Sequence, residues 1–380
     1  MATFEVLVTT VSNAREHPNA DRLTINEIFG YTCISNKKDG NWRYNAGDNV
    51  CYIGENSVLP EWLLKKCDLW DFDKNKGRLA GKEGNRLRPV KLRGVYSEGL
   101  IYPVHKTEDG LLFIETLNGN EYVKNGDDVK DMLGITKYEP VIPESMSGEL
   151  VGVGFKPVKF DPEPLEKHMG IFNGDSIVTV TEKLHGTFCG ITYCMNDAHE
   201  GTFLNNRVLV YSKGYGSKGL CFKDDPKNDG NIYVKALKSI DPEKLEKWVT
   251  QFYGTTHVHI LGEVYGKGVQ DLHYDLDTKA FRVFAIGCSI SPTETHWACF
   301  ASVAEHCNEL GLQTVPALYT GPYDYDKMVK LRDGKSTLAN HVKEGIVITL
   351  DSTDPTFGRE ALIKFVNPDY KLRKNATEYN

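Results

Sequence analysis

No stretch of the sequence approaches the roughly 18 consecutive apolar residues from which a membrane-spanning helix is built. The first residues, Met1–Glu5, also lack a basic segment followed by an apolar one, the pattern of a secretion signal. We therefore expect a protein without a membrane partner that remains in the cytoplasm, where it is made.

Paired cysteines are also missing. The nine cysteines are odd in number, and no two of them are spaced C-x-x-C, which argues against both a disulfide framework and a thiolate zinc site. We expect reduced cysteines, mostly in the core. With 380 residues, of which 40% are hydrophobic and 26% charged, the chain predicts a globular protein of two domains.

An excess of positive charge is absent: 45 basic residues stand against 52 acidic ones, so the net charge is −7, and this argues against simple coating of nucleic acid. The basic residues are, however, unevenly distributed along the chain. Between Lys74 and Gly94, eight basic residues stand against one acidic residue, Glu83. Two interpretations stay open for this basic run: a solvated surface, or a contact with nucleic-acid phosphates.

The first part of the chain consists of short apolar runs separated by Gly, Asn and Asp. Many short strands with such turns favour a small closed barrel. The runs cover residues 4–8, 23–28, 49–53, 87–92 and 99–102. Five prolines then fall within residues 139–164, which predicts a linker between a first domain, 1–138, and a second domain, 165–380.

The second domain alternates strand-like runs with a few helices. Apolar residues at helical spacing predict helices over residues 242–253 and 297–310. Short links between its strands favour an antiparallel sheet. The predicted fold class is therefore α+β, with a barrel followed by a domain built on antiparallel sheets.

Three patterns imitate known sites. Residues 214–219 match G-x-G-x-x-G, but loop residues follow where a dinucleotide site requires a helix. Gly334-Lys335-Ser336-Thr337 imitates a phosphate loop, yet Val329 occupies the place of the first glycine. His257 and His259 share a strand face but have no third metal ligand nearby, so we interpret them as surface or core histidines.

Lys183 has the setting of a nucleophile. It follows the apolar run 176–180 and precedes a tight turn at Gly186, within Thr181-Glu182-Lys183-Leu184-His185-Gly186-Thr187. A lysine with its ordinary pKa of about 10.4 is protonated near neutral pH, so it needs desolvation or nearby positive charge to act. An exposed lysine at a strand end is the simpler alternative.

Further charged residues follow Lys183 in a fixed order on apolar runs: Glu263 in residues 257–266, Glu344 before 345–348, and Lys364 in 361–366, with the apolar run 281–286 between the first two. Together these motifs resemble those of the covalent nucleotidyltransferases. The E-K-x-H-G form of the first motif resembles the ATP-dependent RNA ligases.

The first domain carries a second resemblance. His17-Pro18-Asn19-Ala20-Asp21-Arg22-Leu23 is similar to the opening of OB-type tRNA-binding modules, although a simple turn also explains it. Residues 47–52, 57–60, 90–94 and 97–100 resemble the N-terminal OB domain of one branch of RNA ligases, the nick-sealing Deinococcus and Naegleria type.

The resemblance implies an OB-like RNA-binding domain followed by an adenylyltransferase domain. It implies that Lys183 takes AMP from ATP, that Lys364 steadies the α-phosphate, and that Glu344 holds Mg²⁺ or Mn²⁺. Glu263 would either share this cation or hydrogen-bond the ribose. Phe284 would stack on adenine. The other residues that the resemblance places at the nucleotide are Glu182, Leu184, His185, Gly186, Thr187, Lys213 and Lys371.

The implied reaction joins RNA 3′-hydroxyl and 5′-phosphate ends, at nicks in a duplex, through lysyl-AMP and RNA-adenylate, in a monomeric enzyme. Two positions depart from the family pattern. Val366 stands where a second lysine is usual, so Lys371 or another residue must replace it, and Lys213 stands where many ligases have arginine.

Alternatives come from two other classes. DNA ligases and capping enzymes carry their OB domain after the last motif, but only 380 − 364 = 16 residues follow Lys364 here. A nucleic-acid-binding protein with an inactive transferase domain is the other alternative. The joint presence of Lys183, Glu263, Glu344 and Lys364 argues against it.

Overall fold

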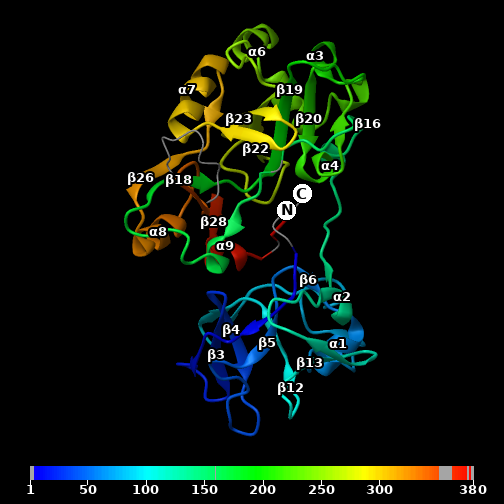
Figure 1. Cartoon of the computed structure of the whole chain (residues 1–380), viewed down its shortest axis with the longest axis vertical. Helices are drawn as coiled ribbons and strands as arrows, with labels where there is room; N and C mark the ends of the chain where they lie inside the picture. Colours follow the sequence, from blue (N-terminus) through cyan, green and yellow to red (C-terminus); the bar gives the residue numbers. More distant parts are fainter. Residues whose placement is uncertain (1–3, 159, 351–361, 375, 378–380) are drawn as a thin grey trace. The chain divides into compact units, whose positions relative to one another are not determined.

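The structure is a computed structural model that describes residues 4–158, 160–350, 362–374 and 376–377. Its contacts divide the chain into two units, Met1–Glu139 with Glu166–Met169, and Pro140–Leu165 with Gly170–Asn380 (Figure 1). Most strand pairs are antiparallel and the helices are few, so the predicted α+β class is confirmed. Among the described residues, no helix is long and apolar enough to cross a membrane.

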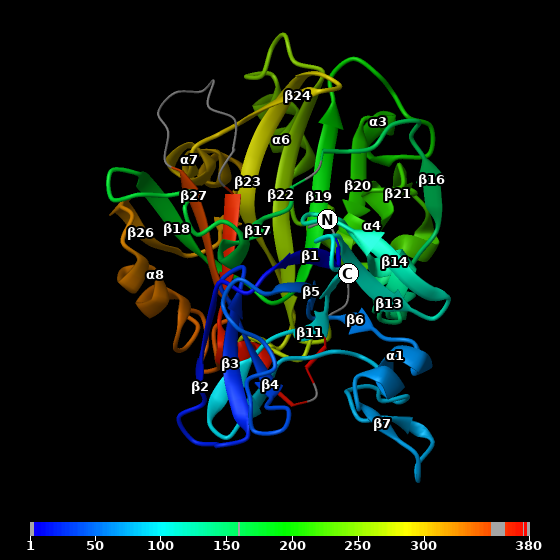
Figure 2. The ribbon, with the colours of Figure 1, turned by 60° about the horizontal axis from the view of Figure 1, so that its bottom comes forward.

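The first unit is built from short strands and two short helices, as the turn-rich sequence predicts. The unit contains three three-stranded sheets, β1-β5-β11, β2-β3-β4 and β12-β13-β14, and three two-stranded ladders, β10-β9, β15-β6 and β7-β8. Figure 2 shows β2, β3 and β4 side by side. The bounds are β1 Leu7–Thr10, β2 Asn13–Glu16, β3 Leu23–Ile28, β4 Tyr31–Asn36, β5 Asn49–Ile53, β6 Ser57–Val58, α1 Glu61–Lys66, β7 Trp70–Asp71, β8 Lys76–Gly77, β9 Val90–Leu92, β10 Val95–Ser97, β11 Leu100–Pro103, β12 His105–Lys106, β13 Leu112–Thr116, β14 Gly119–Val123, α2 Lys130–Leu133 and β15 Thr136–Lys137.

Strand β5 shows how this unit buries its core. Successive strand residues point to opposite faces. Val50 and Tyr52 pack into one apolar cluster and Cys51 and Ile53 into another. Both faces of the sheet at β5 are therefore covered by apolar side chains. Tyr31 stacks on Tyr52 with 5.2 Å between ring centroids.

The His17–Asn19 turn holds the β9–β10 hairpin. His17 Nε2 lies 3.1 Å from the carbonyl oxygen of Leu92, and the Asn19 side-chain amide donates to the carbonyl of Arg93 at 2.9 Å. Arg93 and Gly94 form the two-residue loop, with φ of 47° and 90°. Such loops need left-handed residues, which explains the glycine. The turn thereby fixes a hairpin that belongs to the basic run.

The second unit contains the larger sheets. Its five-stranded sheet has the order β17-β28-β27-β18-β26, its six-stranded sheet includes β20-β19-β22-β23-β24 with β25 on β23, and β16 pairs with β21. The strands are β16 Leu150–Gly152, β17 Glu163–Pro164, β18 Ile177–Lys183, β19 Thr187–Cys194, β20 Val208–Ser212, β21 Leu220–Phe222, β22 His257–Gly266, β23 Lys279–Ser291, β24 Glu294–Trp297, β25 Gln313–Thr314, β26 Ala317–Pro322, β27 Gly345–Leu350 and β28 Leu362–Val366. Ala361, which the sequence places in the last strand, lies outside the described residues.

Three helices cover one face of the six-stranded sheet. The helices are α3 Phe203–Asn206, α4 Lys213–Gly216, α5 Ile232–Lys238, α6 Pro242–Val249, α7 Phe300–Leu310, α8 Tyr325–Arg332 and α9 Pro368–Lys371, with 3-10 turns η1 Glu144–Met146, η2 Leu165–Lys167 and η3 Pro226–Asn228. Apolar side chains of α5, α6 and α7 share one cluster with β19, β22 and β23. The helical spacing in the sequence therefore identifies α6 and α7 correctly, although both are shorter than predicted.

The proline-containing stretch before the second unit is packed against it. Met146 is buried in the core that α5 helps to form, and β16 adds an antiparallel partner to β21. The Asn228 side-chain amide donates to the carbonyl of Glu149 at 2.9 Å, and that of Asn231 donates to the carbonyl of Ser147 at 3.0 Å. By their contacts, many of the residues predicted to form a linker therefore belong to the second unit.

Candidate active site

Lys183 and Glu344 meet where two neighbouring strands pair. Lys183 ends β18 and lies opposite Gly345, the first residue of β27. Its Nζ is 2.5 Å from Glu344 Oε1. A Cβ at position 345 would lie 2.3 Å from the carbonyl oxygen of Phe365, so only glycine allows β28 to pass this close. The predicted nucleophile and the predicted metal ligand thus form one ion pair.

Glu263 belongs to the same site. It lies on β22 beside β19, opposite Phe188. Burial raises the pKa of Glu263 to about 8, the negative charge of Glu344 adds to this rise, and the positive charge of Lys183 opposes it. A Cβ on Gly186 would meet Glu263 Cγ at 2.9 Å and the carbonyl oxygen of Val264 at 2.2 Å, which explains the glycine in the first motif.

Lys364 is surrounded by charge. It lies on β28 opposite Val347. Burial lowers the pKa of Lys364 to about 8, and the charges of Lys183, Lys213 and Lys371 lower it further, while Asp161 opposes them. Lys371, from the short helix α9, therefore lies close enough to act on Lys364. It supplies a positive charge where Val366 replaces the second lysine of the family pattern. We refer to Lys183, Lys213, Lys364 and Lys371 as the lysine cluster.

Lys213 reaches this cluster from the start of α4. Ser212 caps that short helix by accepting a hydrogen bond from the backbone N–H of Tyr215 at 3.3 Å. Lys213 Nζ lies 2.7 Å from Asp161 Oδ1. Burial alone would raise the pKa of Asp161, but the charge and the hydrogen bond of Lys213, together with the charge of Lys364, lower it below its ordinary value. Strand β21 follows directly after α4, so the G-x-G-x-x-G pattern opens no long helix.

Phe284 stands on the same face of the six-stranded sheet as Glu263. The register between β22 and β23 shifts beside Phe284, so its face is identified by its contact with the ring of Phe188, which lies opposite Glu263 on β19. The Phe284 ring has Phe188 at 6.0 Å and Phe160 at 5.0 Å between centroids. By contrast, Phe281 packs against the main core. Of the two rings, Phe284 is the one placed toward the charged groups.

His185 is held in a buried network. Its Nε2 lies 2.8 Å from Asp271 Oδ1, and its Nδ1 lies 2.7 Å from the hydroxyl of Tyr370 on α9. Arg373 also donates to Asp271, at 3.1 and 3.2 Å. Although burial raises the pKa of Asp271, hydrogen bonds from His185 and Arg373 outweigh it and keep that pKa well below its usual range. The network fixes the turn that follows Lys183.

Three other predicted contacts have side chains directed into the protein. The carboxylate of Glu182 accepts hydrogen bonds from Ser336 Oγ at 2.5 Å and Thr337 Oγ1 at 2.6 Å. Leu184 is buried in an apolar cluster, and the Thr187 hydroxyl lies 2.8 Å from that of Tyr233. Nothing in these contacts supports a side-chain role for these residues toward a nucleotide.

The carboxylates can accept a hard cation. Glu344 Oε2 is buried and has no hydrogen-bond partner among the residues that the structure describes, and an orphaned carboxylate oxygen is a suitable ligand for Mg²⁺ or Mn²⁺. Within the same residues, no three His, Cys, Asp or Glu side chains are grouped to hold a metal ion by themselves. A cation here would need oxygen ligands from a bound phosphate or from water.

His259 is a core histidine. Its ring nitrogens lie 2.9 Å from the hydroxyl of Thr192 and 2.8 Å from that of Ser289.

The site also contains residues that the sequence does not single out: Asp161, Asp271, Tyr370 and Arg373. Asp161 lies in the proline-containing stretch, where composition favours a linker. The other three come from a loop and from the chain after Lys364. Their only signal in the sequence is the presence of charged or hydroxyl groups near the motifs, which is too common to be informative.

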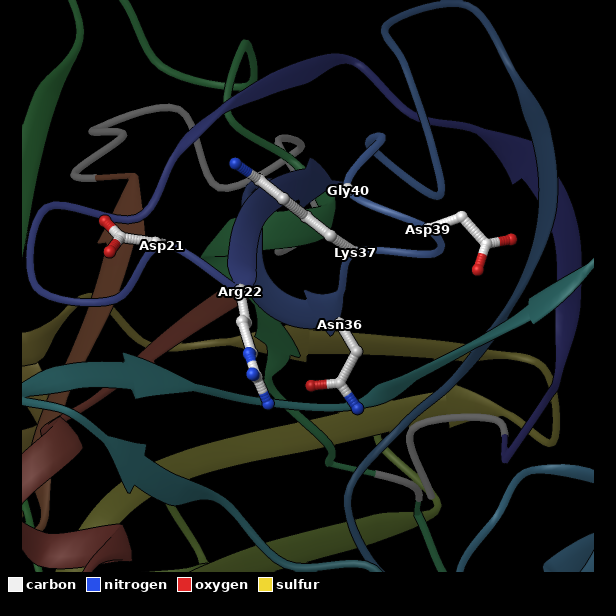
Figure 3. A pocket seen from close by; sticks show the side chains of 6 residues that line it. All are labelled: Asp21, Arg22, Asn36, Lys37, Asp39 and Gly40. Atoms are coloured by element: carbon white, nitrogen blue, oxygen red, sulfur yellow. The ribbon is translucent and has the colours of Figure 1, made fainter.

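A separate pocket lies in the first unit. Its volume is about 520 Å³, and it is lined by Asp21, Arg22, Asn36, Lys37, Asp39 and Gly40 (Figure 3). The carboxylates of Asp21 and Asp39 point away to either side, and Lys37 is paired with Glu16 at 2.7 Å. Its charges are of both signs and do not converge, unlike those of the lysine cluster.

Comparisons with known proteins agree with this arrangement. A sequence profile described as RNA ligase matches residues 176–366, and one described as an OB-fold domain matches residues 6–104. No curated protein matches the chain. The fold is similar to solved structures of an RNA ligase from Naegleria gruberi, one with pyrophosphate (22% identity, TM-score 0.70) and one of a variant with AMP and manganese (22% identity, TM-score 0.73). Each similarity covers 97% of this chain and 98% of the other.

Proposed function

The chain belongs to the RNA ligase family, and we propose that it uses ATP to join RNA 3′-hydroxyl and 5′-phosphate ends at nicks in a duplex. The observation that carries the proposal is the position of Lys183. Its amine lies 2.5 Å from Glu344 and within electrostatic reach of Lys364 and Glu263. Solved structures of the similar Naegleria ligase contain ATP or AMP with manganese.

In the first step, neutral Lys183 Nζ attacks the α-phosphorus of ATP. A nitrogen–phosphorus bond forms, the bond to the β-phosphate oxygen breaks, and pyrophosphate leaves. Lys183 must first lose its ammonium proton to water; the contact with Glu344 opposes that loss, whereas the positive charges of Lys364 and Lys213 favour it. The same cations stabilise the negative charge that spreads over the α-phosphate oxygens.

The next two steps use the same groups. A 5′-phosphate oxygen of the RNA attacks the lysine-bound phosphorus and releases Lys183, giving RNA-adenylate. The 3′-hydroxyl oxygen then forms a bond to the 5′-phosphorus and gives its proton to water, while the bond from that phosphorus to the AMP oxygen breaks and AMP leaves with the electron pair. A divalent cation held by Glu344, and by Glu263 once ionised, would neutralise phosphate charge in each step. Phe284 offers its ring to the base.

The first unit would hold the RNA. Its match to an OB-fold profile and its basic β9–β10 hairpin support this role, because phosphate contacts of lysine and arginine supply affinity without reading sequence. We propose a nicked duplex as the substrate and a monomer as the acting species.

The test is covalent labelling. Wild-type protein incubated with α-labelled ATP and Mg²⁺ should retain one AMP, whereas Lys183→Ala should retain none. Lys218→Ala removes an exposed lysine from the same unit and should be labelled like wild type. Labelling of Lys183→Ala would refute the proposal. Preferential labelling by GTP would favour a capping-type transferase, and no labelling at all would favour an inactive RNA-binding protein.

A further inference from the structure

Phe160 stacks on the ring of Phe284, the aromatic side chain of the candidate nucleotide site. Its centroid is 5.0 Å from that of Phe284, with 27° between the ring planes. The ring of Trp297 also contacts Phe160, with 5.2 Å between centroids and 66° between the ring planes. Two rings stacked at this distance leave no room for a third between them. Phe160 therefore occupies one face of the Phe284 ring, where a stacked base would otherwise lie.

Asp161, the next residue, supplies an anion to the lysine cluster. Its Oδ1 is 2.7 Å from Lys213 Nζ, and only 4% of its side chain is exposed. Its negative charge also acts on Lys364. A buried carboxylate of this kind is stable only while cations remain beside it. The lysines that would bind a phosphate are thus already neutralised in part.

These two residues reproduce the chemical layout of a nucleotide. AMP has a flat aromatic group at one end and an anion at the other, and Phe160-Asp161 offers a flat ring to Phe284 and an anion to Lys213. We propose that Phe160 and Asp161 occupy the nucleotide position in the free protein and that ATP binds by displacing both. This inference rests on the proposed function, because it uses the same site.

Displacement has a measurable consequence. If the covered form predominates, the apparent dissociation constant for ATP is the intrinsic constant divided by the uncovered fraction. A protein that is covered nine times in ten would bind ATP about tenfold more weakly than its open form. Removing either half of the cover should therefore strengthen binding, which is the opposite of what loss of a ligand contact does.

The experiment measures ATP affinity by calorimetry in the full chain. Lys183→Met in every sample prevents covalent transfer, so that only binding is observed. Phe160→Ala and Asp161→Asn are then compared with Asp229→Asn. Asp229 forms an exposed ion pair with Lys238 at 2.6 Å, so its variant controls for the loss of one negative charge elsewhere in the same unit.

We expect Phe160→Ala and Asp161→Asn each to lower the dissociation constant for ATP about fivefold to tenfold, and Asp229→Asn to leave it unchanged. Weaker binding by Phe160→Ala would mean that the segment closes over the nucleotide, and this would overturn the inference. Stronger binding by Asp161→Asn alone would be a charge effect and would also overturn it. Equal affinity in all variants would refute displacement while leaving the proposed function intact; no binding by any variant would refute both.

Discussion

Lys183 binds one oxygen of Glu344 and leaves the other buried without a hydrogen-bond partner among the described residues. A buried carboxylate oxygen with no partner costs stability. Such a group is expected where a ligand later completes it. The pair therefore combines a contact for the amine with a carboxylate oxygen suited to a cation, at the end of β18 and just before β27.

Glu344→Gln tests this reading. The variant keeps the volume of the side chain but weakens its hold on a cation, so the rate of lysyl-AMP formation should fall about a hundredfold or more. The unfolding midpoint should change little, because one of the two carboxylate oxygens of Glu344 has no hydrogen-bond partner among the described residues. Single-turnover labelling and a urea titration measure the two effects. An unchanged rate at saturating Mg²⁺ and Mn²⁺ would move the metal site elsewhere.

Glu263 should make the stability of the ligand-free protein depend on pH. Its pKa is about 8 in the fold against an ordinary 4.5. Between these values the folded protein keeps a proton that the unfolded chain has lost, so the free energy of unfolding falls as pH rises, by at most about 1.4 kcal/mol per pH unit from this group.

Glu263→Gln removes this titration and should flatten that part of the profile. Urea unfolding of both proteins at pH 5, 6.5 and 8, without nucleotide or metal, gives the comparison. Below pH 4.5 the two should have similar slopes, because Glu263 is then protonated in both states. Parallel profiles from pH 5 to 8 would show that Glu263 is ionised in the free protein.

Asp271→Asn should destabilise the second unit. It leaves Arg373 and His185 without their carboxylate, and loss of one partner of a largely buried pair costs roughly 2–4 kcal/mol. Tyr370→Phe is the milder companion, because it removes only the hydroxyl beside His185, a loss of about 1 kcal/mol. Chemical unfolding of both variants measures the two losses in the free energy of unfolding. Equal losses would mean that Asp271 contributes no more than an ordinary neutral partner.

Two basic residues of the first unit should separate stability from RNA binding. Arg86 donates to Asn56 at 3.0 Å and lies 3.7 Å from the centre of the Tyr138 ring, so Arg86→Ala should lower stability by about 1–3 kcal/mol. Lys91 is exposed on β9. Lys91→Ala should leave the unfolding midpoint unchanged but weaken binding to a nicked duplex and reduce its salt dependence.

Binding at several salt concentrations, together with thermal unfolding, distinguishes the two variants. If Lys91→Ala binds the duplex like wild type at every salt concentration, the β9–β10 hairpin does not contact phosphate. If Arg86→Ala is as stable as wild type, its stacking on Tyr138 contributes nothing measurable.

Much of the fold follows from local pattern. The apolar runs around Lys183, Glu263, Glu344 and Lys364 are strands in the structure, because each carries alternating or continuous apolar residues between turns. The helical spacing before Leu310 likewise corresponds to α7. Local periodicity suffices for these elements, since each buries its own apolar face.

The remainder of the site depends on tertiary contacts. Lys183 and Glu182 are neighbours in one motif, yet strand alternation directs them to opposite sides, and only the fold shows which side carries the charged groups. Asp161 looks like part of a linker because Pro157, Pro162 and Pro164 lie close to it in the sequence. Its partner Lys213 is 52 residues away in the chain, and no local pattern predicts such a pair.

The contact between Glu182 and the 334–337 segment explains why that segment imitates a phosphate loop without being one. Its hydroxyls and a backbone N–H are donors of the type that cradles a phosphate, and the Glu182 carboxylate occupies them. The chain in effect supplies its own anion to this loop. A pattern of donors therefore identifies a phosphate site only when the donors are unoccupied, and making this loop bind a phosphate would first require the removal of Glu182.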